Sequence, residues 1–255
     1  MLESLKKRFQ LKFKDRTFAA NILACIGRFS RKECNECETT IEHSIMKTRK
    51  LRNLKVSAIG YGCMGLSHGY GSVPERIDSI RLIRQAYDWG CTFFDTAEGY
   101  GDGDNVILVG EALKPIRDKI VLATKFRVDK TEQTSTREGL LEEIQSHVDA
   151  SLKRLGTDHI DIYYQHRVNK DIPVEDIDWC MGTLIHEGKI LAWGQSQSTV
   201  EEIRRAHAVT PIIANQSEYS MMDRMFEKNV IPTCEKIGIG FVPFSPLSSG
   251  FLSGK

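Results

Sequence analysis

Four side chains that can hold or transfer a proton lie at or just after short apolar segments of the sequence. They are a carboxylate, a phenol, an ammonium and an imidazole, contributed by Asp95, Tyr100, Lys125 and His166. Acid–base chemistry in proteins is built from such groups. Each group alone has a plainer explanation, because an aspartate often caps a helix and a lone lysine or histidine is usually a surface or core residue. Their joint position is therefore the informative feature.

The segments around these residues form a regular alternation of strands and helices. Strands are expected at 56–62, 92–95, 119–124, 159–164, 188–193, 212–214 and 240–244. Helices are expected from Pro74 to about Gly90, at 105–113, from a capping box at Ser135–Glu138 to Gly156, and at 174–186, 199–208 and 223–236. A spacing of about 30 residues per unit requires parallel strands joined by crossover helices. The sequence thus predicts an α/β fold, a TIM-type (β/α)8 barrel, with a doubly wound open sheet as the competing architecture.

The expected strands place the four side chains at one end of three consecutive parallel strands. Asp95 ends the second strand and Tyr100 follows it, Lys125 follows the third, and His166 follows the fourth. Barrel enzymes build their sites at the carboxyl ends of their strands. We therefore expect one shared site rather than four unrelated residues. An eighth strand–helix unit would lie after Lys255, so the barrel is expected to be incomplete at its C-terminus, as in a truncated gene product.

Composition excludes several classes of protein. The chain has 255 residues, 35 basic and 34 acidic side chains and a net charge of +1, which gives no overall field to attract nucleic acid or anionic lipid. The longest apolar run of the N-terminal segment, Phe18–Ile26, is far shorter than the about 20 residues that a membrane span needs. Seven scattered cysteines suggest reduced thiols of a cytoplasmic protein. Cys34 and Cys37 have metal-ligand spacing, but no second pair accompanies them, so no metal site is expected.

The chain also divides into two expected regions. Residues 1–45 show no clean helical or strand periodicity and mix basic clusters with acidic residues, so they are interpreted as an N-terminal extension outside the core. Residues 46–255 carry the alternation and form the expected barrel.

A glycine motif near the first strand suggests an alternative dinucleotide site. Gly60–Gly65 has the spacing G-x-G-x-x-G, but a Rossmann site needs a helix that begins at the third glycine. Here a loop with two more glycines runs on to Pro74, and Asp95 lies 30 rather than about 20 positions past Gly65. A loop that lines a site at the strand end is the better interpretation. Met64, His68 and Tyr70 in this loop are candidates to border a substrate pocket.

From about residue 46 onward, the sequence resembles the aldo/keto reductase family, close to its bacterial-type members. The motifs that carry the resemblance follow one another in the family's order: Gly60–Ser67, Phe94–Gly101, Ala123–Phe126, Tyr163–His166, Gly188–Ile190, Asn215–Tyr219 and Phe241–Leu247. The resemblance implies a TIM barrel and the reduction of aldehydes or ketones to alcohols by hydride transfer. It also implies a small carbonyl substrate and NADPH as cofactor. NADH remains open, because the segment that reads the 2′-phosphate would lie after Lys255.

The resemblance further implies a role for each matching residue. Asp95, Tyr100, Lys125 and His166 match the catalytic tetrad, with Tyr100 as general acid, Lys125 favouring its phenolate, and Asp95 holding the lysine. Ser196, Gln216, Phe244, Ser245 and Leu247 match cofactor-binding positions. Two alternatives stay open for the same barrel: a regulatory or binding subunit, and an inactive truncated remnant. The oligomeric state and the particular substrate are not indicated by the sequence.

Overall fold

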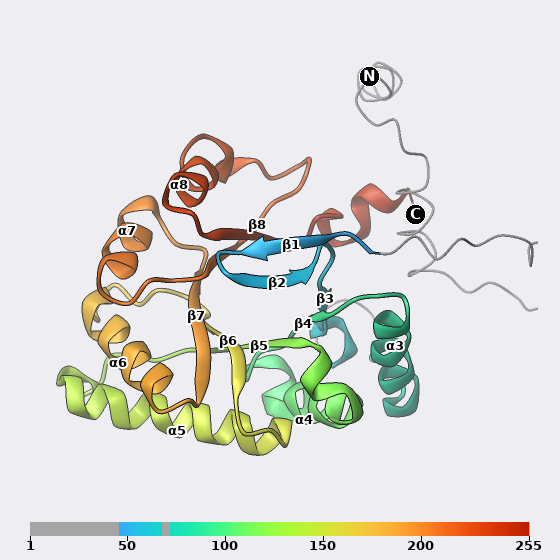
Figure 1. Cartoon of the computed structure of the whole chain (residues 1–255), viewed down its shortest axis with the longest axis horizontal. Helices are drawn as coiled ribbons and strands as arrows, with labels where there is room; N and C mark the ends of the chain where they lie inside the picture. The colour runs from blue at the N-terminus through green and yellow to red at the C-terminus, as the bar shows by residue number, and fades with distance from the viewer. Residues whose placement is uncertain (1–45, 68–71, 255) are drawn as a thin grey trace, which may run out of the picture. The chain divides into compact units, whose positions relative to one another are not determined.

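A computed structural model describes residues 46–67 and 72–254 of the chain. Its larger compact unit, Ile45–Ser249, is built on seven parallel strands paired in sequence order (Figure 1). The strands are β3 (Tyr61–Gly62), β4 (Phe93–Asp95), β5 (Val121–Phe126), β6 (Ile160–Gln165), β7 (Ile190–Ser196), β8 (Ala214–Glu218) and β9 (Gly240–Phe244). This is the predicted TIM-type arrangement, a nearly closed barrel of parallel strands. Within the described residues, no strand pairing joins β3 to β9.

Crossover helices connect these strands and cover the outer face of the sheet. They are α3 (Arg76–Asp88), α4 (Asp104–Leu113), α5 (Arg137–Leu155), α6 (Val174–His186), α7 (Val200–Val209) and α8 (Val230–Ile237). Apolar residues at helical spacing explain their packing, as with buried Ile144, Val148 and Leu155 of α5. Short 3-10 helices lie between the larger elements: Met64–Leu66, Tyr100–Gly103, Lys114–Lys119, Gln133–Ser135, Met225–Lys228 and Ser248–Ser253.

Apolar side chains fill the part of the barrel interior near the amino-terminal ends of the strands, and a β-hairpin covers them. Strands β1 (Thr48–Leu51) and β2 (Leu54–Ser57) pair antiparallel and contribute Leu51 and Val56 to the cluster of interior side chains. Leu51 packs on Gly240, the first residue of β9, where a Cβ atom would lie 2.3 Å from the leucine Cδ2. The hairpin therefore lies at the amino-terminal ends of the strands, which leaves the carboxyl ends for polar side chains.

Four local predictions were wrong. The expected strand 212–214 shares only Ala214 with β8, because the buried Ile212 and Ile213 precede the strand, which continues through polar residues to Glu218. The expected strand 56–62 is interrupted: Val56 and Ser57 close the hairpin, and β3 begins only at Tyr61. The expected helix 223–236 is a 3-10 turn followed by α8, because Asn229 leaves helical geometry and caps Val230. Thr136 rather than Ser135 caps α5, since the Thr136 hydroxyl accepts a hydrogen bond from the Gly139 amide at 3.1 Å.

Other expectations concern residues outside the described ranges. The Cys34 and Cys37 pair and the proposed extension 1–45 belong to that part of the chain, as do His68 and Tyr70 of the first loop. Among the described residues, no helix is both long and apolar enough to cross a bilayer.

Candidate active site

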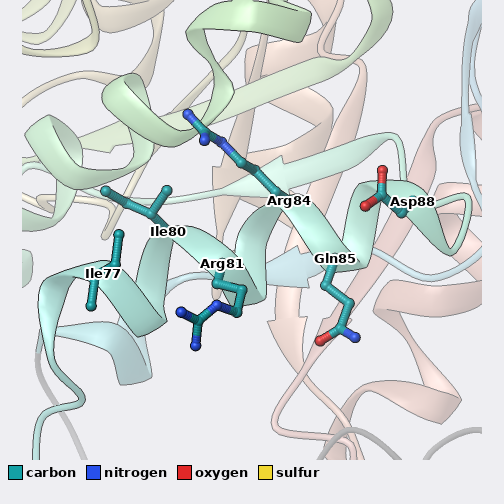
Figure 2. A pocket seen from close by; sticks show the side chains of 6 residues that line it. All are labelled: Ile77, Ile80, Arg81, Arg84, Gln85 and Asp88. Carbon is teal, nitrogen blue, oxygen red and sulfur yellow. The ribbon is translucent and has the colours of Figure 1, made fainter.

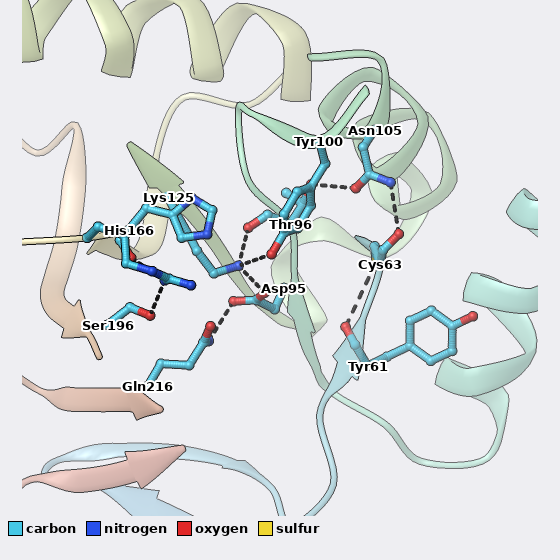
Figure 3. Close-up of polar contacts among 11 residues, drawn as sticks. Tyr61, Cys63, Asp95, Thr96, Tyr100, Asn105, Lys125, His166, Ser196 and Gln216 are labelled. Atoms are coloured by element: carbon cyan, nitrogen blue, oxygen red, sulfur yellow. Dashed lines mark hydrogen bonds and ion pairs between the residues drawn. The ribbon is translucent and has the colours of Figure 1, made fainter. Parts of the chain in front are cut away.

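The four predicted residues converge at the carboxyl ends of β4, β5 and β6 (Figure 3). Asp95 is the last residue of β4, and Lys125 is the fifth of the six residues of β5. Tyr100 opens a 3-10 turn after β4, and His166 directly follows β6. Parallel pairing forces this meeting, because Asp95 lies opposite Ala123 and Lys125 opposite Tyr164 in the sheet register.

Lys125 is the centre of the cluster. Its side chain is only 1% exposed, and Nζ donates to the Asp95 carboxylate, to the Thr96 carbonyl at 2.7 Å and to the Tyr100 hydroxyl at 3.3 Å. Burial alone lowers the pKa of an ammonium, but the charge of Asp95 and the contact with Tyr100 outweigh it, so the pKa of Lys125 is raised. The lysine is therefore a permanent cation beside the phenol.

The ring of His166, which follows β6, packs edge to face with the phenol of Tyr100. The ring centroids of Tyr100 and His166 are 5.9 Å apart, with the planes at 83°. Burial, followed by the nearby cations Lys125, Arg167 and Arg127, lowers the pKa of His166 to about 4. The imidazole is accordingly neutral near pH 7, so that one ring nitrogen can donate a hydrogen bond and the other can accept one.

Two of the predicted cofactor residues join the same network. Gln216 on β8 donates from Nε2 to Asp95 Oδ2 at 2.9 Å, so both carboxylate oxygens of Asp95 are engaged. Ser196 at the end of β7 is 1% exposed and accepts a hydrogen bond from Arg167 Nη1 at 3.2 Å. The pairing of Ser196 with Gln216 across β7 and β8 places these two polar groups side by side.

The other predicted cofactor residues lie after β8 in the chain and outside this network. Phe244 ends β9 and is half-buried, and its carbonyl accepts from the Tyr219 amide at 3.2 Å. Ser245 has a positive φ of 52° and begins a turn closed by the Ser248 amide at 2.9 Å. Leu247, in the same turn, is half-buried. Because β9 is parallel to the other strands, this turn shares the carboxyl end of the sheet.

Several residues of the network were not among the predicted site residues. Asn105 of α4 is fully buried, accepts from the Thr96 hydroxyl at 2.6 Å, and donates to the Cys63 carbonyl at 2.8 Å and to the Ser67 hydroxyl at 2.9 Å. It thereby ties the first loop and α4 to the end of β4. A buried asparagine on an otherwise apolar helix face was the only available signal. The acceptor role of the Thr96 carbonyl has no sequence signal, because every residue carries that group.

A second surface feature is separate from this cluster. A hollow runs along α3, lined by Ile77, Ile80, Arg81, Arg84, Gln85 and Asp88 (Figure 2). None of these residues belongs to the polar network, so the hollow is not the candidate site. In the described ranges, no group of three or more His, Cys, Asp or Glu side chains is arranged to hold a metal ion.

Comparison with known proteins identifies the family of the chain. The pattern of the Aldo/keto reductase family matches residues 58–255. This chain belongs to the aldo/keto reductase family. It is 43% identical over 206 residues to probable aldo-keto reductase 1 of Glycine max, which covers 80% of this chain and 60% of that protein. The chain thus spans about 60% of the length of that curated relative.

Solved structures of aldo-keto reductases share the fold. A thermostable aldo-keto reductase crystallised with the inhibitor epalrestat superposes with a TM-score of 0.71 at 28% identity, over 80% of this chain and 74% of the other. An aldo-keto reductase from Bacillus halodurans in its holo form gives 0.70 at 30% identity, over 81% and 68%. The family and the barrel predicted from sequence are therefore confirmed.

Proposed function

We propose that this chain reduces aldehydes or ketones to alcohols with a reduced nicotinamide cofactor, and that Tyr100 donates the proton. The contact that carries the proposal is Lys125 Nζ, buried between the Asp95 carboxylate and the Tyr100 hydroxyl. A phenol is a weak acid with a reference pKa of about 10, so it needs a neighbour that stabilises its anion. The raised pKa of Lys125 keeps that neighbour charged.

The proton balance of the reaction follows from these groups. When a hydride adds to the carbonyl carbon, the C=O π electrons become a negative charge on oxygen. Tyr100 gives its O–H proton to that oxygen, which yields the alcohol, and the resulting phenolate lies beside the Lys125 ammonium. Asp95 holds the lysine in place, and the neutral His166 ring can donate an N–H to the carbonyl oxygen. Solvent then returns a proton to Tyr100.

The residues present fit the cofactor's carboxamide. The amide of Gln216 donates to Asp95, which leaves Oε1 as an acceptor for a carboxamide N–H. The Ser196 hydroxyl accepts from Arg167, which leaves its own hydrogen to donate to a carboxamide oxygen. A reduced nicotinamide supplies the hydride when bound. Phe244 provides an aromatic face at the end of β9, and Ser245 and Leu247 are the proposed contacts of the phosphate-bearing part of NADPH.

The test measures aldehyde turnover and NADPH binding in parallel for the wild type and for variants of Tyr100 and a control tyrosine. Tyr100→Phe should lower kcat for a simple aldehyde at least about 100-fold, the usual contribution of a positioned general acid. Binding of NADPH, followed by isothermal titration, should change little, because the phenolic hydroxyl acts only in the chemical step. Tyr87→Phe on α3 is the control and should leave both quantities unchanged. Undiminished turnover in Tyr100→Phe would contradict the assignment.

The same measurements separate the alternatives. NADPH and NADH titrated side by side would establish the cofactor preference. Tight nucleotide binding without turnover of any aldehyde or ketone would indicate a binding or regulatory role for this barrel instead. The lack of both binding and turnover would indicate an inactive chain.

A further inference from the structure

Glu98 fastens the loop that carries Tyr100 to the end of β5. Its backbone amide donates to the Lys125 carbonyl at 3.2 Å, and its Oε1 accepts from the Arg127 amide at 2.9 Å. One contact is to the proposed catalytic lysine itself and the other is to the residue two positions after it, so the two flank Phe126. Only Gly99 separates Glu98 from Tyr100, whose amide donates to the Ala97 carbonyl at 3.0 Å. The distance from the phenol to Lys125 Nζ therefore depends on how firmly Glu98 is held.

His147 on helix α5 holds the second oxygen of that carboxylate. Its Nδ1 lies 2.8 Å from Glu98 Oε2, and its Nε2 lies 3.4 Å from Glu143 Oε1, one helical turn earlier. The side chains of His147 and Glu98 are only 26% and 15% exposed. The ring thus lies between two carboxylates, and α5 fixes it in place through the buried neighbours Ile144 and Val148.

The surroundings of His147 favour its protonated form. The hydrogen bond to Glu98 raises the pKa of His147, burial opposes the shift, and the charges of Glu98 and Glu143 add to it. Tyr163 of β6 also faces Glu98, but burial raises the pKa of its phenol well above 10, so it stays neutral. Beyond Glu98, the Arg127 side chain pairs with Asp129 at 3.7 Å.

The sign of the pH effect follows from this raised pKa. The doubly protonated ring donates to both carboxylates, whereas the neutral ring has a single N–H to donate. Both charge-assisted hydrogen bonds are complete below the ordinary histidine pKa of about 6.5. As the pH rises through the higher pKa of the folded protein, the ring loses its charge and one of its two N–H donors, which weakens its hold on Glu98.

We propose that His147 is a positioning residue whose protonation sets how tightly Glu98 holds the Tyr100 loop against β5. Carbonyl reduction then loses rate as His147 loses its proton above about pH 6.5. The inference rests on the proposed role of Tyr100. It extends that role to a helix on the outer side of the sheet, outside the polar network around Lys125.

The kinetic test follows kcat from pH 5.5 to 9 at saturating substrate and NADPH, with the full chain. The wild type should lose about fivefold in kcat through a step above pH 6.5, the scale expected for slight misplacement of a reacting group. His147→Gln should lack this step, since its amide does not titrate, and Glu143→Gln should move it to lower pH. His159→Gln is the matched control. His159 Nδ1 lies 2.6 Å from Asp158 Oδ1, and this pair has no contact with the Tyr100 loop among the described hydrogen bonds and ion pairs. A step of the same size in His147→Gln would overturn the inference.

A second readout does not need turnover. In NMR titrations, the Arg127 amide, which donates to Glu98, should shift with the same midpoint as the His147 ring. Glu98→Gln should lower the His147 midpoint. If the wild type reduces no carbonyl, the proposed function fails while this titration still tests the coupling. If reduction occurs but the Arg127 amide ignores His147, the inference alone fails.

Discussion

At the scale of single residues, Lys125 contributes both to the stability of the fold and to the proposed catalysis, and the two contributions can be measured separately. Its ammonium is buried and paired, so removing it leaves the Asp95 carboxylate, whose side chain is only 16% exposed, with one fewer partner. Removal of one member of a buried pair typically costs about 3–5 kcal/mol, whereas removal of both is much less damaging. Stability and catalysis should therefore respond differently to single and double substitutions.

Lys125→Met should lower the free energy of unfolding by about 3 kcal/mol in urea titrations and abolish measurable reduction. Lys125→Met combined with Asp95→Asn should recover part of that stability without recovering activity. The recovery is expected because the neutral amide no longer requires a cation. Equal destabilisation in the single and double variants would show that the pair has no energetic coupling.

The proposed catalytic residues could be identified from sequence, but their immediate partners could not. Asp95, Tyr100, Lys125 and His166 have distinctive side chains in recognisable motifs at strand ends. The carbonyl of Thr96 and the amide of Arg127, by contrast, are backbone groups, and only the folded loop aims them at Lys125 and Glu98. The contact of Arg167 with Ser196 joins residues 29 positions apart and depends on the pairing of β6 with β7.

At the scale of elements, helix α5 shows why boundaries are harder to predict than helices. The pattern from 135 to 156 predicted the helix and its end at Gly156, which has the expected left-handed φ of 65°. Ser135 and Glu138 have capping-box spacing, yet Ser135 lies in a preceding 3-10 turn and donates its hydroxyl to the Glu132 carbonyl. Two adjacent hydroxyl residues offer two caps, and the local turn decides between them.

The two hydroxyls allow a direct comparison. Thr136→Ala should lower the free energy of unfolding by about 1 kcal/mol, because it removes the acceptor for the Gly139 amide. Ser135→Ala should cost only a few tenths of a kcal/mol, since its hydroxyl is exposed. Thermal and urea unfolding of both variants would measure the difference. A larger loss of unfolding free energy in Ser135→Ala than in Thr136→Ala would show that Ser135 is the cap of α5.

At the scale of the whole molecule, the βα rhythm predicted parallel strands with crossover helices, and the family resemblance favoured the barrel over an open sheet, but the hairpin was missed. Seven strands repeat with regular spacing, and periodicity of this kind survives errors of several residues at each boundary. Strands β1 and β2 have four residues each and stand outside that rhythm. Their position depends on contacts with interior side chains, such as Leu51 with Gly240, that no local pattern encodes.

The free energy of unfolding should depend on pH through a buried carboxylate outside the site, Asp178. Asp178 of α6 is fully buried, and neither carboxylate oxygen has a normal hydrogen bond within the described ranges. Burial raises its pKa to about 8, and the nearby amides of Thr210 and Val209 offset this only in part. Between about pH 4 and pH 8 the unfolded chain binds fewer protons at this residue than the native one, so stability falls as pH rises.

Asp178→Asn should remove that dependence, and its stability relative to wild type should rise between pH 5 and pH 8 by up to about 4 kcal/mol, at about 1.4 kcal/mol per pH unit. Urea titrations at both values would measure it. The exposed Asp118→Asn is the control and should follow the wild-type curve. An identical fall in stability for Asp178→Asn and wild type would assign the pH dependence to other groups.

The hairpin at the amino-terminal ends of the strands also has a practical consequence. Its turn, Arg52 and Asn53, is exposed, and Arg52 has a positive φ of 54°, the geometry of a tight reversal. The reacting groups are gathered at the opposite ends of the same strands. A dye, a tether or a short peptide inserted at this turn would therefore serve as a handle that leaves the mouth of the barrel unobstructed.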